Sequence, residues 1–227
     1  MLDAGLFHQG GDSNVESNCG LPVASSRVES LLSVMATRSL SADDYEWMRV
    51  NGHLSVEVKR RQHELRARED VQSFYRSGNT KLLISAVNHF TRASKPKDGI
   101  DVLMPMYPFD SVEFDVKLRV DLLLAFGRAV RRYFKHESKN LRDYALMLEC
   151  GELCLRLMPG NQKVLCYLGM TALVGEKFED ATHWFVRANR AGVPMRRVRS
   201  DVLGYYSSVD TAVQEKMRKA IRWVGFN

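Results

Sequence analysis

The sequence predicts an all-α protein, and three observations support this fold class. Apolar residues recur at the helical spacing i, i+3, i+4, i+7 along most of the chain after residue 25. No segment shows the apolar–polar alternation, bounded by turn residues, that half-buried strands require. The chain has 227 residues, of which 45% are hydrophobic, and this is enough to bury a real core. We therefore expect antiparallel helical hairpins as the main architecture.

The N-terminal part divides into a tail and a helical segment. Residues 1–25 are rich in Gly, Ser and Asn without periodicity, which predicts a disordered tail. Residues 26–95 are expected to be helical. In order, this segment has an apolar stripe at Val28, Leu31, Leu32 and Met35, a capping pattern from Ser41 to Asp44, a long polar helix over 54–76, and a helix capped by Thr80 that ends before Pro96.

A proline-rich stretch follows at residues 96–110, and it contains three of the six prolines of the chain. Proline removes a backbone donor and interrupts a helix interior. We therefore expect an irregular loop there, which acts as a hinge or a joint between subdomains. Further helices are expected near 111–136, 140–157, 161–174, 178–191, 195–207 and 209–224, so that residues 111–227 form the C-terminal helical hairpins.

Two neighbouring segments carry complementary packing faces. Ala181, Phe185 and Ala188 fall on one side of a helix, with a ring between two small residues. The preceding helix has a stripe of Leu165, Leu168, Gly169 and Ala172. A glycine inside a helix costs about 1 kcal/mol relative to alanine, and close approach of another helix is the natural reason for it. We expect these two faces to pack against each other.

This pair resembles a tetratricopeptide repeat (TPR). The family pattern of Leu-Gly, then Ala with Phe four residues later, then Pro is met at Leu168-Gly169, Ala181, Phe185 and Pro194, whereas Leu165 and Ala172 replace its Trp and Tyr. Ala86, Phe90 and Ala93 repeat the same spacing upstream. The resemblance implies a TPR-like α-solenoid over the C-terminal part, closed by a capping helix that buries Val213, Met217, Ile221 and Val224. The alternative is an irregular helical bundle.

In that family the first helix of each hairpin lines a groove that holds a peptide. Carried onto this chain, the client-binding stripe is Lys163, Tyr167, Met170 and Val174. The resemblance therefore implies a non-catalytic adaptor or chaperone for a protein or peptide client, a role that small repeat chaperones of bacterial secretion systems also have. The alternative is that a neighbouring hairpin covers this stripe, because a helix that is apolar all round is usually buried.

The charge distribution supports a second interpretation. The net charge is +6, yet residues 1–58 hold eight acids and three bases, so basic residues concentrate later, around 59–68, 131–142 and 195–201. Two basic helices around a short turn near residue 208 resemble a nucleic-acid-binding helix-turn-helix. Its candidate contacts are Arg196, Arg197, Arg199, Lys216, Arg218, Lys219 and Arg222. Ordinary solvated helix faces would give the same pattern.

The sequence offers little for catalysis. Six histidines are scattered without an HExxH motif, and no phosphate-binding loop, G-x-S-x-G or dinucleotide motif is present. Cys150, Cys154 and Cys166 could bind zinc, but they are better explained as small apolar core residues. We expect no catalytic residues, metal or cofactor. Without CxxC spacing, a secretory signal or a long apolar run, we expect a cytoplasmic protein that does not insert into membranes.

Overall fold

The computed structural model describes residues 21–225, which are helical and contain no strand. The chain divides into two compact units, Met1–His53 and Leu54–Asn227. The predicted all-α class is thus confirmed for the described part of the chain. The boundary between the units follows His53, so the expected joint at residues 96–110 is not where the chain divides.

The first unit contains helices α1 (Leu21–Val34) and α2 (Ala42–Val50). The Ser41 hydroxyl accepts a hydrogen bond from the Asp44 amide at 3.1 Å, which confirms the predicted cap. Arg27 stacks over the Trp47 ring at 4.3 Å and thereby links the two helices. Helix α1 begins at Leu21, so the end of the expected tail over 1–25 is helical; the remainder of that tail lies outside the described residues.

Helices α3 (Val56–Ser77), α4 (Thr80–Arg92) and α5 (Pro96–Leu103) open the second unit and pack in succession. Helix α4 is capped by Asn79, not by Thr80, because the Asn79 side chain accepts from the Lys81 amide. The buried Glu64 carboxylate of α3 pairs with Arg68 at 2.7 Å and with Lys95 at 2.8 Å. Arg68 lies on α3 itself, whereas the pair with Lys95 joins α3 to the N-cap residue of α5.

The expected irregular loop over 96–110 is largely a helix. Pro96 stands at the first turn of α5, where no backbone donor is needed, so this proline starts a helix instead of breaking one. A short 3-10 turn, η1 (Met104–Met106), follows. The regular structure stops only at the cis Tyr107–Pro108 bond and at Phe109, whose φ is 61° and whose side chain is fully buried. Helix α5 packs against α4 and α6, so it belongs to the core.

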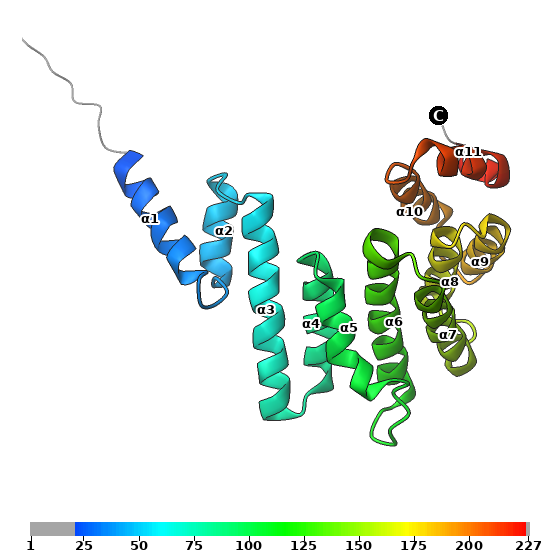
Figure 1. Ribbon diagram of the computed structural model, residues 1–227, viewed down its shortest axis with the longest axis horizontal. Helices are drawn as coiled ribbons and strands as arrows, with labels where there is room; N and C mark the ends of the chain where they lie inside the picture. Colours follow the sequence, from blue (N-terminus) through cyan, green and yellow to red (C-terminus); the bar gives the residue numbers. More distant parts are fainter. Residues whose placement is uncertain (1–20, 226–227) are drawn as a thin grey trace, which may run out of the picture. The chain divides into compact units, whose positions relative to one another are not determined.

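The rest of the second unit is a run of helices in close agreement with the predicted ranges (Figure 1). Helix α6 (Val116–Tyr133) continues into a π-helical turn, η2 (Phe134–Ser138), and packs on α7 (Leu141–Leu157). Helix α8 (Gln162–Val174) packs on α9 (Phe178–Arg190). Helices α10 (Met195–Tyr206) and α11 (Thr211–Ala220) follow, and η3 (Arg222–Val224) ends the described part. The expected last helix therefore stops before Ile221, although Met217, Ile221 and Val224 are buried.

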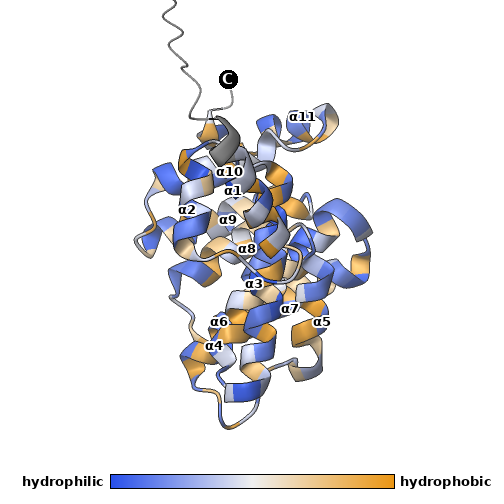
Figure 2. Ribbon diagram, turned by 90° about the vertical axis from the view of Figure 1, so that its left-hand side faces the viewer, coloured by the Kyte–Doolittle hydropathy of each residue, from blue (hydrophilic) through white to orange (hydrophobic). Residues whose placement is uncertain are grey.

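Hydrophobic and hydrophilic residues are interspersed along these helices, as expected for amphipathic helices with one apolar face (Figure 2). They enclose two clusters of buried side chains. The first cluster is centred on α6 and includes Phe126, Tyr167 and Leu168; the second joins α8 to α11 and includes Leu165, Ala172 and Phe185. Helix α8 contributes to both clusters, which explains why it is apolar on nearly every side.

The predicted packing of α8 against α9 is confirmed at its centre. A Cβ atom added to Gly169 would lie 2.5 Å from Cε1 of Phe185, so the glycine makes room for the ring. Ala181 and Ala188 are completely buried on either side of Phe185. Leu168 is an exception: it contacts Gly151 of α7 and belongs to the first cluster, not to the α9 face.

Candidate functional site

Alternate helices of the second unit (α6, α8 and α10) line a cavity of about 470 Å³. Arginine side chains dominate its charge, and we call it the arginine cavity. Its lining comprises Arg128 and Arg131 of α6, Gln162, Lys163, Cys166, Tyr167 and Met170 of α8, Val193 of the loop between α9 and α10, and Arg197 and Asp201 of α10. Each of the three helices thus brings at least one charged residue to this cavity.

None of the three arginines that line this cavity has a carboxylate partner in the described part of the chain. No carboxylate oxygen there lies within 4.0 Å of a side-chain nitrogen of Arg128, Arg131 or Arg197. Lys163 does have such a partner, because its Nζ lies 3.9 Å from Oδ1 of Asp121. The cavity therefore presents guanidinium groups whose hydrogen-bonding capacity toward an anion is unused.

Arg131 is the innermost of the three. Its side chain is half-buried, Nη1 donates a hydrogen bond to the Tyr167 carbonyl oxygen at 3.3 Å, and its guanidinium lies 5.2 Å from the centre of the Tyr167 ring. Burial lowers the pKa of Arg131 and the neighbouring Arg128 lowers it further, whereas Tyr167 and the Asp201 carboxylate oppose this shift. Removal of this cation from water is unfavourable, and an anion in the cavity would offset that cost.

A second cavity, of about 520 Å³, lies beside the first, and valines form much of its apolar lining. We call it the valine cavity. Its apolar lining residues are Phe134, Val174, Tyr205, Val209 and Val213, and its polar rim includes Lys135, His136, Lys139, Glu176, Ser208 and Asp210.

Several polar groups of this rim have partners within the protein. Lys135 donates to the Ser208 hydroxyl at 2.6 Å, and its Nζ lies 4.9 Å from the centre of the Tyr205 ring. Glu176 pairs with Lys216 at 2.7 Å, and Asp210 caps α11 by accepting from the Val213 amide at 2.9 Å. His136 and Lys139 are exposed at the edge. The valine cavity therefore presents polar and apolar groups together.

The two cavities are neighbours along the same side of all three helices. On each helix, at least one residue that lines the arginine cavity is followed four positions later by a residue that lines the valine cavity, and such residues lie on one helix face. These pairs are Arg131 and Lys135 of α6 and η2, Met170 and Val174 of α8, and Asp201 and Tyr205 of α10. We call the surface that contains both cavities the α6/α8/α10 face.

All four residues of the predicted client-binding stripe reach this face. Lys163, Tyr167 and Met170 line the arginine cavity, and Val174 lines the valine cavity. The stripe is less open than a groove requires, however, since Tyr167 is 3% exposed and Val174 is 8% exposed. Met170 is half-buried and Lys163 is exposed.

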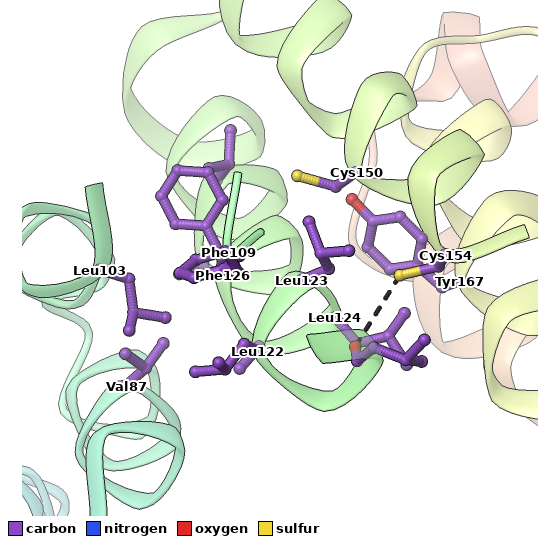
Figure 3. Close-up of a cluster of buried hydrophobic side chains, with 14 of the residues drawn as sticks. Val87, Leu103, Phe109, Leu122, Leu123, Leu124, Phe126, Cys150, Cys154 and Tyr167 are labelled. Atoms are coloured by element: carbon purple, nitrogen blue, oxygen red, sulfur yellow. Dashed lines mark hydrogen bonds between the residues drawn. The ribbon is translucent and has the colours of Figure 1, made fainter. Parts of the chain in front are cut away.

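At Tyr167, the burial agrees with the alternative in which neighbouring helices cover the stripe. Its hydroxyl donates to the Met147 carbonyl oxygen at 2.9 Å, and the ring lies among core side chains beside Cys150 and Cys154 (Figure 3). The Tyr167 ring fits there because Gly127 of α6 and Gly151 of α7 carry no Cβ atoms, which would otherwise contact it. Tyr167 nevertheless belongs to the lining of the arginine cavity.

The arginines of α6 were not predicted as site residues. Arg131 lies in the basic stretch 131–142, Arg128 lies outside it, and Arg197 was predicted to belong to a helix-turn-helix surface. The two α6 arginines are three positions apart and share a helix face, which is a visible signal. Their approach to Arg197 depends on the packing of α6, α8 and α10, and no local pattern encodes that packing.

The basic residues of the proposed helix-turn-helix are all exposed, but most contact other protein groups. Lys216 pairs with Glu176, Arg218 and Lys219 pair with Glu215, and Arg199 donates to the Gly225 carbonyl oxygen. Arg196 and Arg222 are exposed, on α10 and η3 respectively. Much of the charge on α11 is thus compensated within the protein.

The three described cysteines are free thiols, and Cys19 lies outside the described residues. Burial raises the pKa of Cys154 to about 12, and it also raises the pKa values of Cys150 and Cys166. Over residues 21–225, no three His, Cys, Asp or Glu side chains are grouped so that they could hold a metal ion.

One histidine pair was not anticipated, because its members are 26 residues apart in sequence. The Nδ1 atoms of His63 on α3 and His89 on α4 are 2.9 Å apart, so the two rings share a hydrogen bond. Burial lowers the pKa of both imidazoles. This pair lies on helices that do not line the α6/α8/α10 face.

Among the described helices, none has the length and apolar character that a membrane span would need. The chain matches no protein-family model, and comparisons with curated proteins and with solved structures find no match.

Proposed function

We propose that the protein is a non-catalytic adaptor or chaperone of TPR-like construction, which binds an acidic segment of a partner protein on the α6/α8/α10 face. The observation that carries this proposal is the convergence of Arg128, Arg131 and Arg197 on one cavity without a carboxylate partner among the described residues. The free thiols Cys150, Cys154 and Cys166 support a cytoplasmic location, where thiols stay reduced.

A carboxylate suits this cavity for physical reasons. The planar guanidinium group donates two parallel hydrogen bonds to a carboxylate, and such charge-assisted bonds are about twice as strong as neutral ones. A volume of about 470 Å³ is within the usual range for ligand sites. Because Arg131 is already half-buried in the free protein, ligand binding removes less water from its guanidinium group.

Two features favour an acidic peptide over nucleic acid. Single-stranded nucleic acid is held largely by bases stacked on exposed aromatic rings, whereas Tyr167 and Tyr205 on this face are only 3% and 8% exposed. In addition, Asp201 lines the arginine cavity, and Asp121 pairs with Lys163 of its lining. These two carboxylates would repel a continuous row of phosphates. A peptide with few carboxylates avoids both difficulties.

The proposal is tested by fluorescence anisotropy with a labelled peptide on the order of ten residues long. The peptide contains one or two glutamates, and its control has glutamine at each of those positions. We expect binding of the glutamate peptide only, with affinity that falls as salt rises. A labelled single-stranded oligonucleotide of similar length is measured in parallel, and tighter binding of the oligonucleotide would overturn the proposal.

Two neighbouring arginines of α10 provide a matched pair of variants. Arg197 lines the arginine cavity, whereas Arg196 is exposed and does not. Arg197→Glu should weaken peptide binding about tenfold or more, while Arg196→Glu, with the same change in net charge, should have a much smaller effect. Equal weakening by the two variants would show that the attraction comes from general charge and not from the cavity. Thermal unfolding confirms that both variants are folded.

A further inference from the structure

The positive charge of the arginine cavity exceeds the charge of a single carboxylate. We infer that the acidic group bound there is a phosphorylated side chain of the partner protein, whose phosphate contacts Arg128, Arg131 and Arg197 together. This inference rests on the proposed function and specifies the chemistry of its ligand. It also implies regulation, because only the phosphorylated form of the partner binds tightly.

The charges around the cavity show the excess. Four cations line it, namely Arg128, Arg131, Lys163 and Arg197. Two carboxylates oppose them, namely Asp201, which lines the cavity, and Asp121, which pairs with Lys163. Four positive and two negative charges leave a net charge of +2. One glutamate would leave half of this charge uncompensated, whereas a phosphate monoester carries a charge of about −1.5 to −2 at pH 7.

The number of unused donor groups also favours phosphate. Three guanidinium groups line the cavity without a carboxylate partner in the described part of the chain. A phosphate monoester has three terminal oxygens, all of them strong acceptors, whereas a carboxylate has two. Each guanidinium group can therefore bind its own phosphate oxygen, while three groups would compete for the two oxygens of one carboxylate.

The charged groups of α6 and α10 act on one another across the cavity. Burial lowers the pKa of Arg131; among the charged side chains, Arg128 lowers it further and Asp201 raises it. Burial raises the pKa of the Cys166 thiol, on which Arg197 and Asp201 act in opposite directions. Asp201 thus lies within electrostatic range of groups on both sides, yet it forms no ion pair with any of the three arginines. The space between these arginines remains open to a ligand anion.

A phosphate attached to a peptide suits this cavity better than free phosphate or nucleic acid does. A phosphate group alone fills only part of about 470 Å³, and the remaining volume admits the side chain that carries it. Asp121 and Asp201 would repel the neighbouring phosphates of a nucleic acid, but a phosphopeptide brings a single phosphate. The ligand is therefore a phosphorylated protein segment.

The test compares four peptides with one host sequence and a different central insert. The inserts are serine, glutamate, two adjacent glutamates, and phosphoserine. The paired glutamates match the charge of phosphoserine, about −2, without gathering three oxygens on one centre. Labelled peptides are titrated with the full chain by fluorescence anisotropy. We expect phosphoserine to bind about tenfold tighter than the paired glutamates, and we expect no binding of the serine peptide.

Matched variants of α6 locate the effect in the cavity. Arg128 lines the arginine cavity and Arg132 does not, although both are exposed on the same helix. Arg128→Gln should remove most of the preference for phosphoserine over the paired glutamates, whereas Arg132→Gln should preserve it. Thermal unfolding verifies that both variants are folded. An unchanged preference with Arg128→Gln, or an equal loss with Arg132→Gln, would overturn the contact with three arginines.

The outcomes separate this inference from the proposed function. Equal affinity for phosphoserine and the paired glutamates would refute the phosphate assignment but leave acidic-peptide binding intact. Inorganic phosphate and unlabelled phosphopeptide are also compared as competitors, and equal potency would show that the site recognises free phosphate and not a partner segment. Absence of binding by every acidic peptide, phosphoserine included, would overturn the proposed function itself.

Discussion

The Phe185 ring of α9 occupies the space in which a side chain at Gly169 of α8 would begin, since a Cβ atom there would lie 2.5 Å from Cε1 of the ring. This close approach makes the second buried cluster intolerant of even one added methyl group at residue 169.

Gly169→Ala should therefore destabilise the protein by about 1–3 kcal/mol, because the cost of overpacking exceeds the gain in helix propensity. Gly204→Ala is the control, since Gly204 lies in α10 with no neighbouring atom within 4 Å of an added Cβ. That variant should be stabilised by up to about 1 kcal/mol. Urea unfolding measures both effects, and equal stability changes in the two variants would contradict the observed packing.

Tyr167→Phe should cost about 1–3 kcal/mol, because it removes the buried hydrogen bond to Met147 and leaves that carbonyl group without this donor. Tyr75 is 79% exposed, so Tyr75→Phe should be close to neutral and serves as the control. The comparison of unfolding midpoints checks the prediction. A neutral Tyr167→Phe would indicate that the ring is solvated, as a groove residue would be.

The His63–His89 pair should make stability depend on pH. Burial lowers the pKa of both imidazoles below the ordinary value of 6.5; Arg66 and Arg92 lower both further, while Asp70 opposes this at His89. The folded state therefore binds fewer protons than the unfolded state, and the free energy of unfolding is highest above about pH 6.5 and falls as the pH drops through the folded pKa values. His89→Gln should reduce this dependence.

The measurement is the urea midpoint from about pH 8 to about pH 5.5, compared between the unmodified protein and the His89→Gln variant. His183→Gln is the control, because His183 is exposed on α9 and distant in sequence from the pair. An unchanged slope with His89→Gln would show that other groups cause the dependence.

Cys150 and Cys154 should resist alkylation in the native protein. The thiolate is the reactive form, and burial raises the pKa of Cys154 to about 12 and that of Cys150 still further from its usual range. Cys166 is half-buried at the arginine cavity and should react at an intermediate rate. Peptide mapping after timed iodoacetamide treatment distinguishes these residues, and rapid native labelling of Cys150 would contradict its burial.

The features that the sequence predicted well are local. Gly169 and Ala172 on α8, and Ala181 and Phe185 on α9, lie a few positions apart within single helices, so the helical repeat alone reveals which residues share a face. The Ser41 cap is likewise local, because its hydroxyl accepts from the amide of Asp44 three residues later. Pro96 shows the limit of such local patterns, because proline is unfavourable within a helix and favourable at its first turn.

The features that could not be predicted depend on distant residues. Tyr167 is buried because Gly127 and Gly151 leave space for its ring, and both belong to other helices. The arginine cavity likewise requires Arg131 and Arg197 to line the same space, although 66 positions (197 − 131) separate them in the sequence. The residues that share a helix face could thus be identified from the sequence. Which helices pack against each other depends on the fit of side chains that are distant in sequence.

Helix α8 supplies side chains to both buried clusters, with Tyr167 and Leu168 in the first and Leu165 and Ala172 in the second. Solvent can reach the backbone amides of α8 only when the helices packed on both of its sides move away from it. Hydrogen–deuterium exchange should therefore be slowest in α8 and should approach the rate of global unfolding there, while α11, with one buried residue, opens far more often. A peptide held against α8 and α10 would accordingly slow exchange in α10 and α11 and leave the amides of α8 almost unchanged.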